Sequence, residues 1–320
     1  MTPSKHRVLL AGASGYIGRA VVAALLRRGH EVIALVRNPA AALPGCTIRV
    51  AEVTDADNLA RALDGLRADS VISCLASRSG LPDDARRVDY GANSNLLGAA
   101  RNAGVRRFVL LSAICVQRPR LAFQQEKLRF ESELAASGID YTIVRPTAFF
   151  KSLSGQVERV LAGKPFLVFG DGTQTACKPI SEADLAGYIT DCIDDPSARN
   201  RILPIGGPGP AITPRQQGEL LFNVADRPPQ FRRVPVAMFS AATGILGPLG
   251  KVFPAAAAKA ELARIGQYYA TESMLVWDER RGRYDADATP STGSETLRDH
   301  YVRILRDGMA GQELGDHKLF

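Results

Sequence analysis

The sequence predicts an α/β protein with a doubly wound parallel sheet, and three observations lead to that fold class. Short apolar runs alternate with helical patterns through the first half of the chain, as strands and crossover helices do in a parallel sheet covered on both faces. A glycine-rich loop, "AGASGYIGRA", separates the first run from an amphipathic helix. The chain has 320 residues, 46% of them hydrophobic, which is enough for one large domain and a smaller one.

The expected elements alternate in a regular order up to about residue 150. The apolar runs predict strands at residues 7–12, 31–37, 47–53, 69–75, 106–114 and 140–146. The helical patterns predict helices at residues 15–29, 55–65, within 84–103 and at 121–137. Because crossovers between parallel strands are right-handed, these helices cover both faces of the sheet. We therefore expect the sheet domain at residues 1–150.

Residues 151–320 show a weaker rhythm and are expected to form a smaller substrate-binding region, interleaved with the first domain. Ser181, with Asp184 three residues later, resembles the N-terminal cap of a helix. The apolar run 234–258 carries Lys251 as its only charge. This run predicts a core helix pair or a pocket lid, with contact to a membrane face as the alternative.

Charge and composition exclude several classes of protein. The formal net charge is +7, but the basic residues are spread along the chain, so nucleic acid is not an expected partner and anionic small molecules are. The 5 cysteines include no C-x-x-C pair and the 4 histidines are dispersed, which argues against a disulfide scaffold and a metal site. The N-terminus has no signal-peptide pattern, so we expect a cytoplasmic location.

The glycine loop predicts a dinucleotide site. Gly12 permits a tight turn, Gly15 lets a pyrophosphate approach the backbone, and Gly18 lets the helix pack closely on the sheet. The start of the helix supplies unpaired N–H groups and a partial positive charge for the phosphates. This arrangement is typical of the NAD(P)-binding Rossmann fold. The cofactor-binding residues expected here are Gly12, Ser14, Gly15, Tyr16, Ile17, Gly18 and Arg19.

Two arginines favour NADPH over NADH. Arg37 ends the second strand, where an acid usually binds the free 2′-hydroxyl of NAD, and Arg19 comes one residue after Gly18. Either guanidinium can make charge-assisted hydrogen bonds to a 2′-phosphate. The end of the fourth strand, "CLAS", lies at the usual height of the nicotinamide half, which adds Ala76 to the expected cofactor residues.

The glycine spacing together with Arg37 resembles the atypical short-chain dehydrogenase/reductase family, in its NmrA-like and isoflavone-reductase-like branch. Within it, the chain resembles the NADPH-dependent 8-vinyl reductases of divinyl chlorophyllide or protochlorophyllide. The motifs that carry this resemblance are "FQQEKLRFE", "RPTAFFKSL", "CKPISEADLA", "YYATESMLV", "TPSTGSETL" and "GMAGQELGDHK". The resemblance implies an enzyme of chlorophyll or bacteriochlorophyll biosynthesis, which reduces the 8-vinyl group to ethyl by hydride transfer from NADPH.

The resemblance also implies roles at the carboxyl ends of the strands. Family members place an active-site serine or threonine at Ser112, line the nicotinamide near Pro146, and bind the nicotinamide ribose through a lysine at Lys127. Phe123 stands one helical turn before Lys127, where many carbonyl reductases carry a tyrosine. A vinyl group conjugated with a tetrapyrrole spreads the charge of hydride addition into the ring. The reaction therefore needs no tyrosine donor at that position.

A proton must still reach the inner vinyl carbon. Tyr268, Tyr269 and Glu272 in "YYATES" carry protons that could serve, with water as a rival source, and Tyr269 and Glu272 are the candidate catalytic residues beside Lys127. No metal is expected, and we expect a monomer, with a location at the face of a photosynthetic membrane as an open alternative. The residues expected to contact the pigment are Phe123, Phe149 and Tyr268.

Two other functions stay open on the residues alone. An NmrA-like NADP(H)-sensing regulatory protein would keep the glycine loop and Arg37 and lose the catalytic tyrosine, and the phenyl ring of Phe123 fits that loss. An isoflavone-reductase-like double-bond reductase would share the fold, which does not separate such activities. Lys127 and the motif-rich second half favour the vinyl reductase, and leave open which pigment it prefers.

Overall fold

The computed structural model describes residues 5–250 and 252–308. The chain forms two compact units: unit 1 comprises Met1–Pro146 and Glu182–Ile205, and unit 2 comprises Thr147–Ser181 and Gly206–Phe320. Each unit therefore takes two separate stretches of the chain.

Unit 1 is built on a 7-stranded parallel sheet with the strand order β3-β2-β1-β4-β5-β6-β8. The order runs outward in both directions from β1, which confirms the predicted doubly wound arrangement. The strands are β1 (Arg7–Ala11), β2 (Glu31–Val36), β3 (Thr47–Val50), β4 (Ser70–Ser73), β5 (Arg107–Leu111), β6 (Asp140–Pro146) and β8 (Arg201–Ile205).

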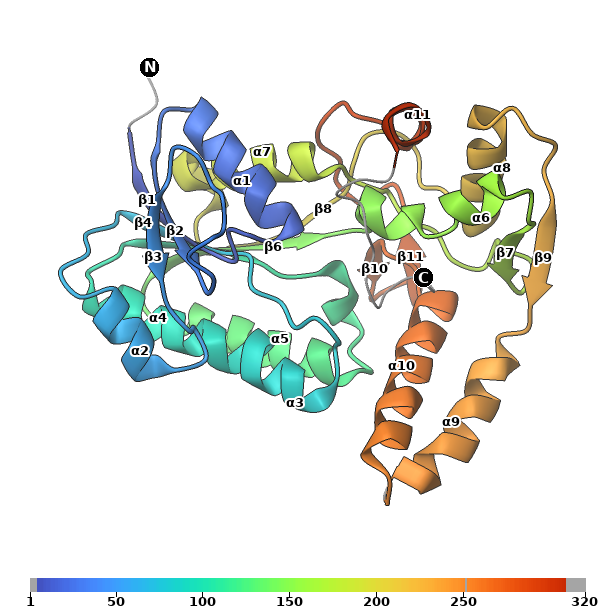
Figure 1. Ribbon diagram of the computed structural model, residues 1–320, viewed down its shortest axis with the longest axis horizontal. Helices are drawn as coiled ribbons and strands as arrows, with labels where there is room; N and C mark the ends of the chain where they lie inside the picture. The colour runs from blue at the N-terminus through green and yellow to red at the C-terminus, as the bar shows by residue number, and fades with distance from the viewer. Residues whose placement is uncertain (1–4, 251, 309–320) are drawn as a thin grey trace. The chain divides into compact units, whose positions relative to one another are not determined.

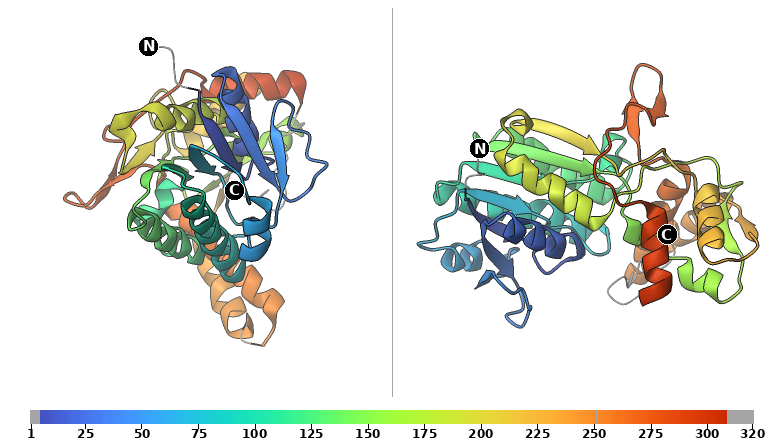
Figure 2. Two further views of the ribbon diagram at one scale, coloured as in Figure 1. Left: turned by 90° about the vertical axis from the view of Figure 1, so that its left-hand side faces the viewer. Right: turned by 90° about the horizontal axis from the view of Figure 1, so that it is seen from above.

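Helices cover both faces of this sheet (Figure 1, Figure 2). One face carries α1 (Tyr16–Arg27) and α7 (Glu182–Asp194), and the other carries α2 (Ala56–Ala62), α4 (Asn93–Asn102) and α5 (Ala122–Ala135). Helix α7 begins directly after Ser181, where the sequence predicts a helix start. Short helical turns are η2 (Ile114–Gln117) and η4 (Pro196–Ala198).

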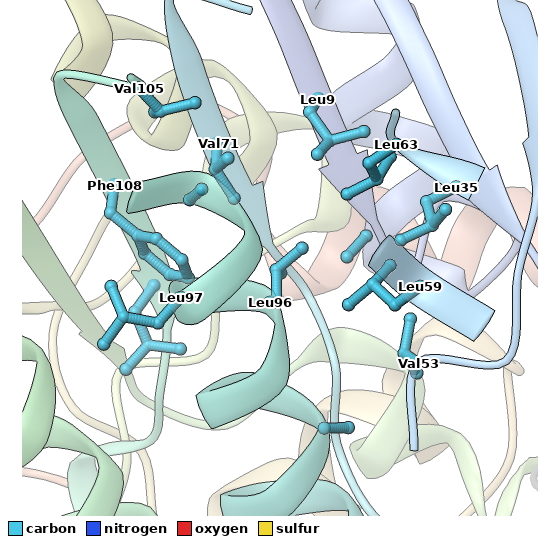
Figure 3. Packing of buried hydrophobic residues seen from close by; sticks show 14 of the residues in the cluster. Leu9, Leu35, Val53, Leu59, Leu63, Val71, Leu96, Leu97, Val105 and Phe108 are labelled. Carbon is cyan, nitrogen blue, oxygen red and sulfur yellow. The ribbon is translucent and has the colours of Figure 1, made fainter. Parts of the chain in front are cut away.

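One core cluster of unit 1 fills the space between the sheet and the helices α2, α4 and α5 (Figure 3). The sheet contributes Leu9, Val71 and Phe108, all almost fully buried. Leu59 of α2 and Leu96 of α4 pack against them from the helical layer. Burying each such side chain stabilises the fold by about 1.5–3 kcal/mol.

The helix expected within residues 84–103 divides into three segments. It begins as α3 (Pro82–Ala85), widens into the π-helix η1 (Arg86–Ala92), and continues as α4. The apolar periodicity predicts the helix but not its widening, because a π-helix depends on contacts away from the segment. Such segments are rare and often lie at functional sites.

The seventh strand, β8, lies outside the sequence prediction. Pro204 stands within it, and β8 pairs with β6 alone, at the edge of the sheet. Proline removes a backbone donor and is tolerated on edge strands. The density of proline and glycine from residue 203 therefore hid a strand that only pairing with β6 defines.

Unit 2 has a smaller core. Phe150, Phe166 and Tyr301 are buried at its centre. Its helices are η3 (Phe150–Ser154), α6 (Val157–Leu161), α8 (Pro214–Val224), α9 (Ala237–Gly250), α10 (Pro254–Thr271) and α11 (Leu297–Asp307). Strand β7 (Phe166–Phe169) pairs in parallel with β9 (Phe231–Val234), and β10 (Val276–Asp278) pairs antiparallel with β11 (Arg283–Asp285).

The apolar run 234–258 forms the α9–α10 hairpin, but the expectation of a core helix pair is wrong. Helix α9 contacts α10, and none of its described residues is buried. Ile245 is 67% exposed, and Val252 and Phe253 in the connecting turn are 72% and 58% exposed. The run is apolar enough for a core, but within residues 5–250 and 252–308 no other layer buries the side chains of α9.

Candidate active site

The glycine loop joins β1 to α1 with a geometry that requires glycine. Gly12 has a φ of +79°, in the left-handed region, and a Cβ there would lie 2.7 Å from the backbone oxygen of Cys74. A Cβ on Gly18 would lie 2.0 Å from the backbone oxygen of Gly12. The loop closes through a hydrogen bond of 3.0 Å from the Gly15 N–H to the Gly12 oxygen. Larger residues at these positions would push the loop off the sheet.

The start of α1 is suited to an anion. Gly15 is the N-cap residue of α1 and makes no side-chain cap, and the first turn of α1 has no acidic residue. The first amides of a helix lack partners within the helix, and its dipole favours negative charge at that end. Ser14 is exposed, Ile17 is buried, and the Tyr16 hydroxyl donates to Glu182 at 2.5 Å. The residues present therefore fit a dinucleotide pyrophosphate.

The two arginines expected to bind a 2′-phosphate differ in their surroundings. Arg19 donates from Nε to the Ser14 oxygen at 3.1 Å and from Nη1 to the Ala42 oxygen at 3.2 Å. It thereby ties the glycine loop to the segment after β2. Arg37 follows β2 directly and is exposed. The hydrogen bond from Thr54 and, to a smaller extent, the charge of Arg37 hold the pKa of Glu52 below its ordinary value.

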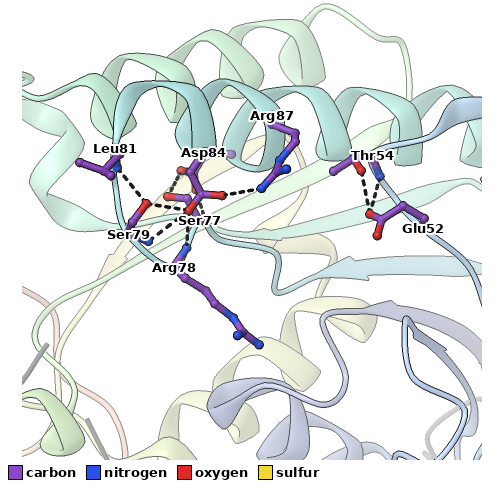
Figure 4. A network of polar contacts seen from close by, with 9 residues as sticks. Glu52, Thr54, Ser77, Arg78, Ser79, Leu81, Asp84 and Arg87 are labelled. Carbon is purple, nitrogen blue, oxygen red and sulfur yellow. Dashed lines mark hydrogen bonds and ion pairs between the residues drawn. The ribbon is translucent and has the colours of Figure 1, made fainter. Parts of the chain in front are cut away.

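The loop after β4 is held by a carboxylate (Figure 4). Asp84 accepts from the backbone N–H groups of Arg78 at 3.0 Å and Ser79 at 3.1 Å. Burial opposes the ionisation of Asp84, but these hydrogen bonds outweigh it and keep its pKa below the ordinary value. Burial raises the pKa of the Cys74 thiol to about 12, so this group stays protonated at neutral pH. Ala76 lies exposed in the same loop.

Helix α5 presents Phe123, Lys127 and Glu131 at successive turns of one face. Its start is fixed by Gln124, whose side-chain oxygen accepts from the backbone N–H of Arg120 at 2.7 Å and of Leu121 at 2.9 Å. Phe123 is buried in the first turn. The face that carries a catalytic tyrosine in many carbonyl reductases therefore holds, in this chain, a phenyl ring, an ammonium and a carboxylate.

Lys127 is paired with a buried aspartate. Its Nζ lies 2.8 Å from Oδ1 of Asp89, whose side chain is fully buried. The hydroxyl of Ser77 donates to Oδ2 of Asp89 at 2.5 Å, and the Ser77 N–H donates to Oδ1 at 3.3 Å. One carboxylate of the π-helix thus holds both the lysine of α5 and the loop after β4.

Ser112 belongs to a second buried network, which is centred on Glu131 of α5. Its hydroxyl donates to Oε1 of Glu131 at 2.5 Å, and Arg145 at the end of β6 pairs with both oxygens of the same carboxylate. Because the Ser112 hydrogen points to Glu131, its oxygen is left with lone pairs only. Ser112 can therefore accept a hydrogen bond in this geometry but does not offer a proton to a substrate.

A narrow gap, too small to hold a water molecule, lies between α5 and the carboxyl ends of β4 and β5. It is lined by Leu75, Asp89, Asn93, Leu110, Leu111, Ser112, Lys127 and Phe130. The predicted site residues Ser112 and Lys127 therefore lie together, and Pro146 ends the neighbouring strand β6. In open α/β sheets, ligands bind at this edge.

The other predicted residues lie in unit 2. Tyr268 is buried and its ring meets the ring of Tyr269 edge-on, with 5.7 Å between centroids. Glu272 is also buried, and its Oε2 accepts from the Tyr284 hydroxyl at 2.5 Å. Phe149 is half-buried and bridges to Ile180. Unit 2 thus groups Tyr268, Tyr269 and Glu272 at the end of α10.

The sequence analysis did not identify Asp89 or Glu131 as site residues, and it did not predict the ion pair between Arg145 and Glu131. Glu131 could have been found, because it stands one turn after Lys127 on the same helix face. Asp89 gave no local signal, since its partners depend on the widening of η1. Across the described residues no group of His, Cys, Asp and Glu side chains could hold a metal ion.

The fold and the glycine loop define an NAD(P)H-binding protein. Residues 12–196 match the NAD(P)H-binding family model. An NADPH-dependent quinone oxidoreductase from Escherichia coli, solved with NADPH, superimposes with a TM-score of 0.68 and 21% identity over 93% of this chain and 99% of that one. At this identity the likeness shows the fold alone.

Two plant proteins, each called divinyl chlorophyllide a 8-vinyl-reductase, chloroplastic, match nearly the whole chain. The protein from Oryza sativa subsp. indica is 50% identical over 100% of this chain and 84% of its own length. The protein from Arabidopsis thaliana is 46% identical over 98% of this chain and 80% of its own length. The chain belongs to the divinyl chlorophyllide a 8-vinyl-reductase family.

Proposed function

We propose that this chain reduces the 8-vinyl group of divinyl chlorophyllide a to an ethyl group with NADPH, as an oxidoreductase of chlorophyll biosynthesis. One observation carries the proposal: 50% identity over the full chain to a plant protein named for this reaction. Phe123 fits it, because an alkene conjugated with a tetrapyrrole needs no oxyanion donor. Divinyl protochlorophyllide is a second candidate substrate.

The cofactor, when bound, supplies the hydride, and residues of unit 1 hold it. The backbone N–H groups after Gly15 would donate hydrogen bonds to the pyrophosphate, where the start of α1 lacks a side-chain cap. Lys127 orients the nicotinamide half at the edge of β4 and β5, and Ser112 accepts a hydrogen bond there. Ala76 and Pro146 border this position. Placement of two large ligands then contributes much of the rate.

Arg37 is proposed to select NADPH by pairing with the 2′-phosphate. It follows β2 and is exposed. The Arg37→Asp substitution replaces this attraction with repulsion. We expect the KM for NADPH to rise about 10–100-fold while NADH improves, since charge-assisted hydrogen bonds contribute about 1.5–3 kcal/mol each. Arg49→Asp, on the neighbouring strand β3, is the matched control. An unchanged KM in Arg37→Asp would remove Arg37 from the cofactor site.

Tyr269 and Glu272 are proposed as sources of the proton, with water as the rival. Glu272 already accepts a hydrogen bond from Tyr284, and Tyr269 is 37% exposed. The substitutions Tyr269→Phe and Glu272→Gln each remove one source. Loss of general acid catalysis should slow turnover by about 100-fold or more without changing the KM for the pigment, and the variant that shows this loss identifies the donor. Full activity in both variants would assign the proton to water.

The activity is tested by incubating the purified chain with NADPH and either divinyl chlorophyllide a or divinyl protochlorophyllide a. We expect a blue shift of the Soret band and a monovinyl product by chromatography. Phe123 favours one other function, an NADP(H)-sensing regulatory protein, because such a protein needs no proton donor. Tight NADPH binding with an unchanged pigment would support that function and overturn the reductase.

A peripheral membrane contact is proposed for the α9–α10 hairpin. Between Arg233 and Lys259 the sequence has Lys251 as its only charge, and Ile245, Val252 and Phe253 are exposed. Apolar tips flanked by basic residues fit an anionic bilayer surface. Among the described residues no helix is both long and apolar enough to cross a membrane. We propose that the protein is cytoplasmic and that the hairpin contacts the membrane from the cytoplasmic side.

Vesicle flotation tests the contact. Wild-type protein should float with vesicles containing anionic lipid, and the Ile245→Ser/Val252→Ser double variant should remain in solution. The matched control is Val302→Ser, an exposed apolar residue of α11, which should float as the wild type does. Equal flotation of the two hairpin forms would exclude the hairpin as the contact.

A further inference from the structure

Lys127 forms an ion pair with Asp89, which lies in the π-helical segment η1. The π-helix η1 spans 7 residues, Arg86–Ala92, between two ordinary α-helices. A wider turn leaves backbone carbonyls without their usual partners. Asn93 compensates, because its amide donates to the Val88 oxygen at 3.3 Å and the Asp89 oxygen at 3.0 Å.

One further hydrogen bond and one glycine keep this segment in place. The Ser73 hydroxyl, at the end of β4, donates to the Asn93 side-chain oxygen at 2.5 Å. A Cβ on Gly91 would lie only 3.3 Å from the Arg86 oxygen, so glycine leaves room inside the widened turn. The Asn93 side chain therefore joins the backbone of the widened segment to the end of β4.

The consequence is the position of one carboxylate. Asp89 is turned inward, fully buried, between Ser77 of the loop after β4 and Lys127 of α5. Ser77 donates to one oxygen and Lys127 approaches the other at 2.8 Å. A buried carboxylate is costly unless it is paired and hydrogen-bonded, and both conditions are met here.

We propose that Asp89 is a positioning residue, which holds the Lys127 ammonium and the loop after β4 at a common point where the nicotinamide half of the cofactor binds. The proposal rests on the proposed role of Lys127 in cofactor binding. Asp89 takes one of the three N–H donors of Lys127 and leaves two for the ligand. Without Asp89, the lysine side chain would be free to leave the edge of the sheet.

A double-mutant cycle tests the coupling. The variants are Asp89→Asn, Lys127→Met and the two together, and the measurement is the Kd for NADPH from the change in its fluorescence. We expect Asp89→Asn to raise the Kd about 10-fold in the wild-type background and less than about 2-fold when Lys127 is already methionine. Equal effects in both backgrounds would show a merely structural role and overturn the proposal.

A matched control and a milder variant complete the test. Glu133 of α5 accepts from the Ser94 hydroxyl of α4 at 2.7 Å and does not contact Lys127, so Glu133→Gln should leave the Kd within about 2-fold. If Asp89→Asn fails to fold by circular dichroism, Ser77→Ala removes one partner of Asp89. This variant should raise the Kd about 3-fold, and only when Lys127 is present.

Pigment reduction gives an independent readout. At subsaturating NADPH, Asp89→Asn should be slow, and saturating NADPH should restore most of the wild-type turnover rate. Binding of NADPH with no reduction by the wild type would refute the proposed function and leave the binding cycle intact as a test of Asp89. A wild-type Kd in Asp89→Asn would refute the positioning role whatever the pigment does.

Discussion

The inner face of α5 and the α9–α10 hairpin differ in which side chains they bury: α5 buries charged side chains, whereas the hairpin exposes apolar ones. On α5, Lys127 and Glu131 are largely buried, and each meets an opposite charge, in Asp89 and Arg145. On the hairpin, apolar side chains such as Ile245 face solvent, and none of the described residues of α9 is buried. On α5, charged side chains are buried because each has a partner of opposite charge. On the hairpin, apolar side chains are exposed although their composition would suit a core.

The difference teaches where to look for function. Scattered exposed apolar residues are ordinary, whereas buried charges and contiguous exposed apolar segments require an explanation. The buried charges lie beside the carboxyl ends of β4, β5 and β6, and the nicotinamide half of the cofactor is proposed to bind at the ends of β4 and β5. The exposed segment lies where a membrane contact is proposed. The buried charges thus coincide with the proposed cofactor site, and the exposed apolar segment coincides with the proposed membrane contact.

The largest expected effect on the free energy of unfolding comes from removing the carboxylate of Glu131 on α5. Glu131→Leu leaves Arg145 buried without its partner, and we expect a loss of about 3–5 kcal/mol in the free energy of unfolding. Glu131→Leu/Arg145→Met removes both charges and should recover most of that loss. Urea unfolding followed by circular dichroism measures both. A double variant as unstable as the single would mean that packing, rather than the unpaired charge, sets the cost.

The intermediate effect concerns Phe123, where a hydroxyl can be restored to the same face. Phe123→Tyr adds a polar group to a buried ring, so we expect a loss of about 1–2 kcal/mol in the free energy of unfolding if the hydroxyl finds no partner. Vinyl reduction should stay within about threefold of wild type, because the reaction needs no donor there. A gain in turnover of about 100-fold, the size of a general-acid effect, would show that the missing hydroxyl limits the enzyme.

The smallest effect is expected on the hairpin. Ile245→Ser should change the free energy of unfolding by no more than about 0.5 kcal/mol, because the side chain is already exposed. Leu134→Ala on α5, which is fully buried, should cost about 2–5 kcal/mol in the same urea experiment. A large loss in Ile245→Ser would show that the hairpin has a core of its own, and the contrast between the two regions would disappear.

Local pattern by itself determined the six strands from residue 7 to residue 146, the helices between them and the glycine loop. The spacing of Gly12, Gly15 and Gly18 is largely a local requirement, because Gly12 has a positive φ and both Gly15 and Gly18 approach the Gly12 oxygen within the same loop. The position of Lys127 on a helix face is equally local. These features depend on neighbours in sequence or on periodicity, so the printed residues predict them.

Tertiary structure decided the partners. Strand β8 exists through its pairing with β6, and Asp89 meets Lys127 because η1 widens and is anchored to β4 through Asn93. Glu131 meets Ser112 and Arg145 only when α5 packs beside β5 and β6. The exposure of α9 also depends on tertiary packing, because no other described part of unit 2 buries its side chains. The physical reason is common to all four: the energy of a buried charge, an edge strand or an apolar face depends on groups far away in the chain.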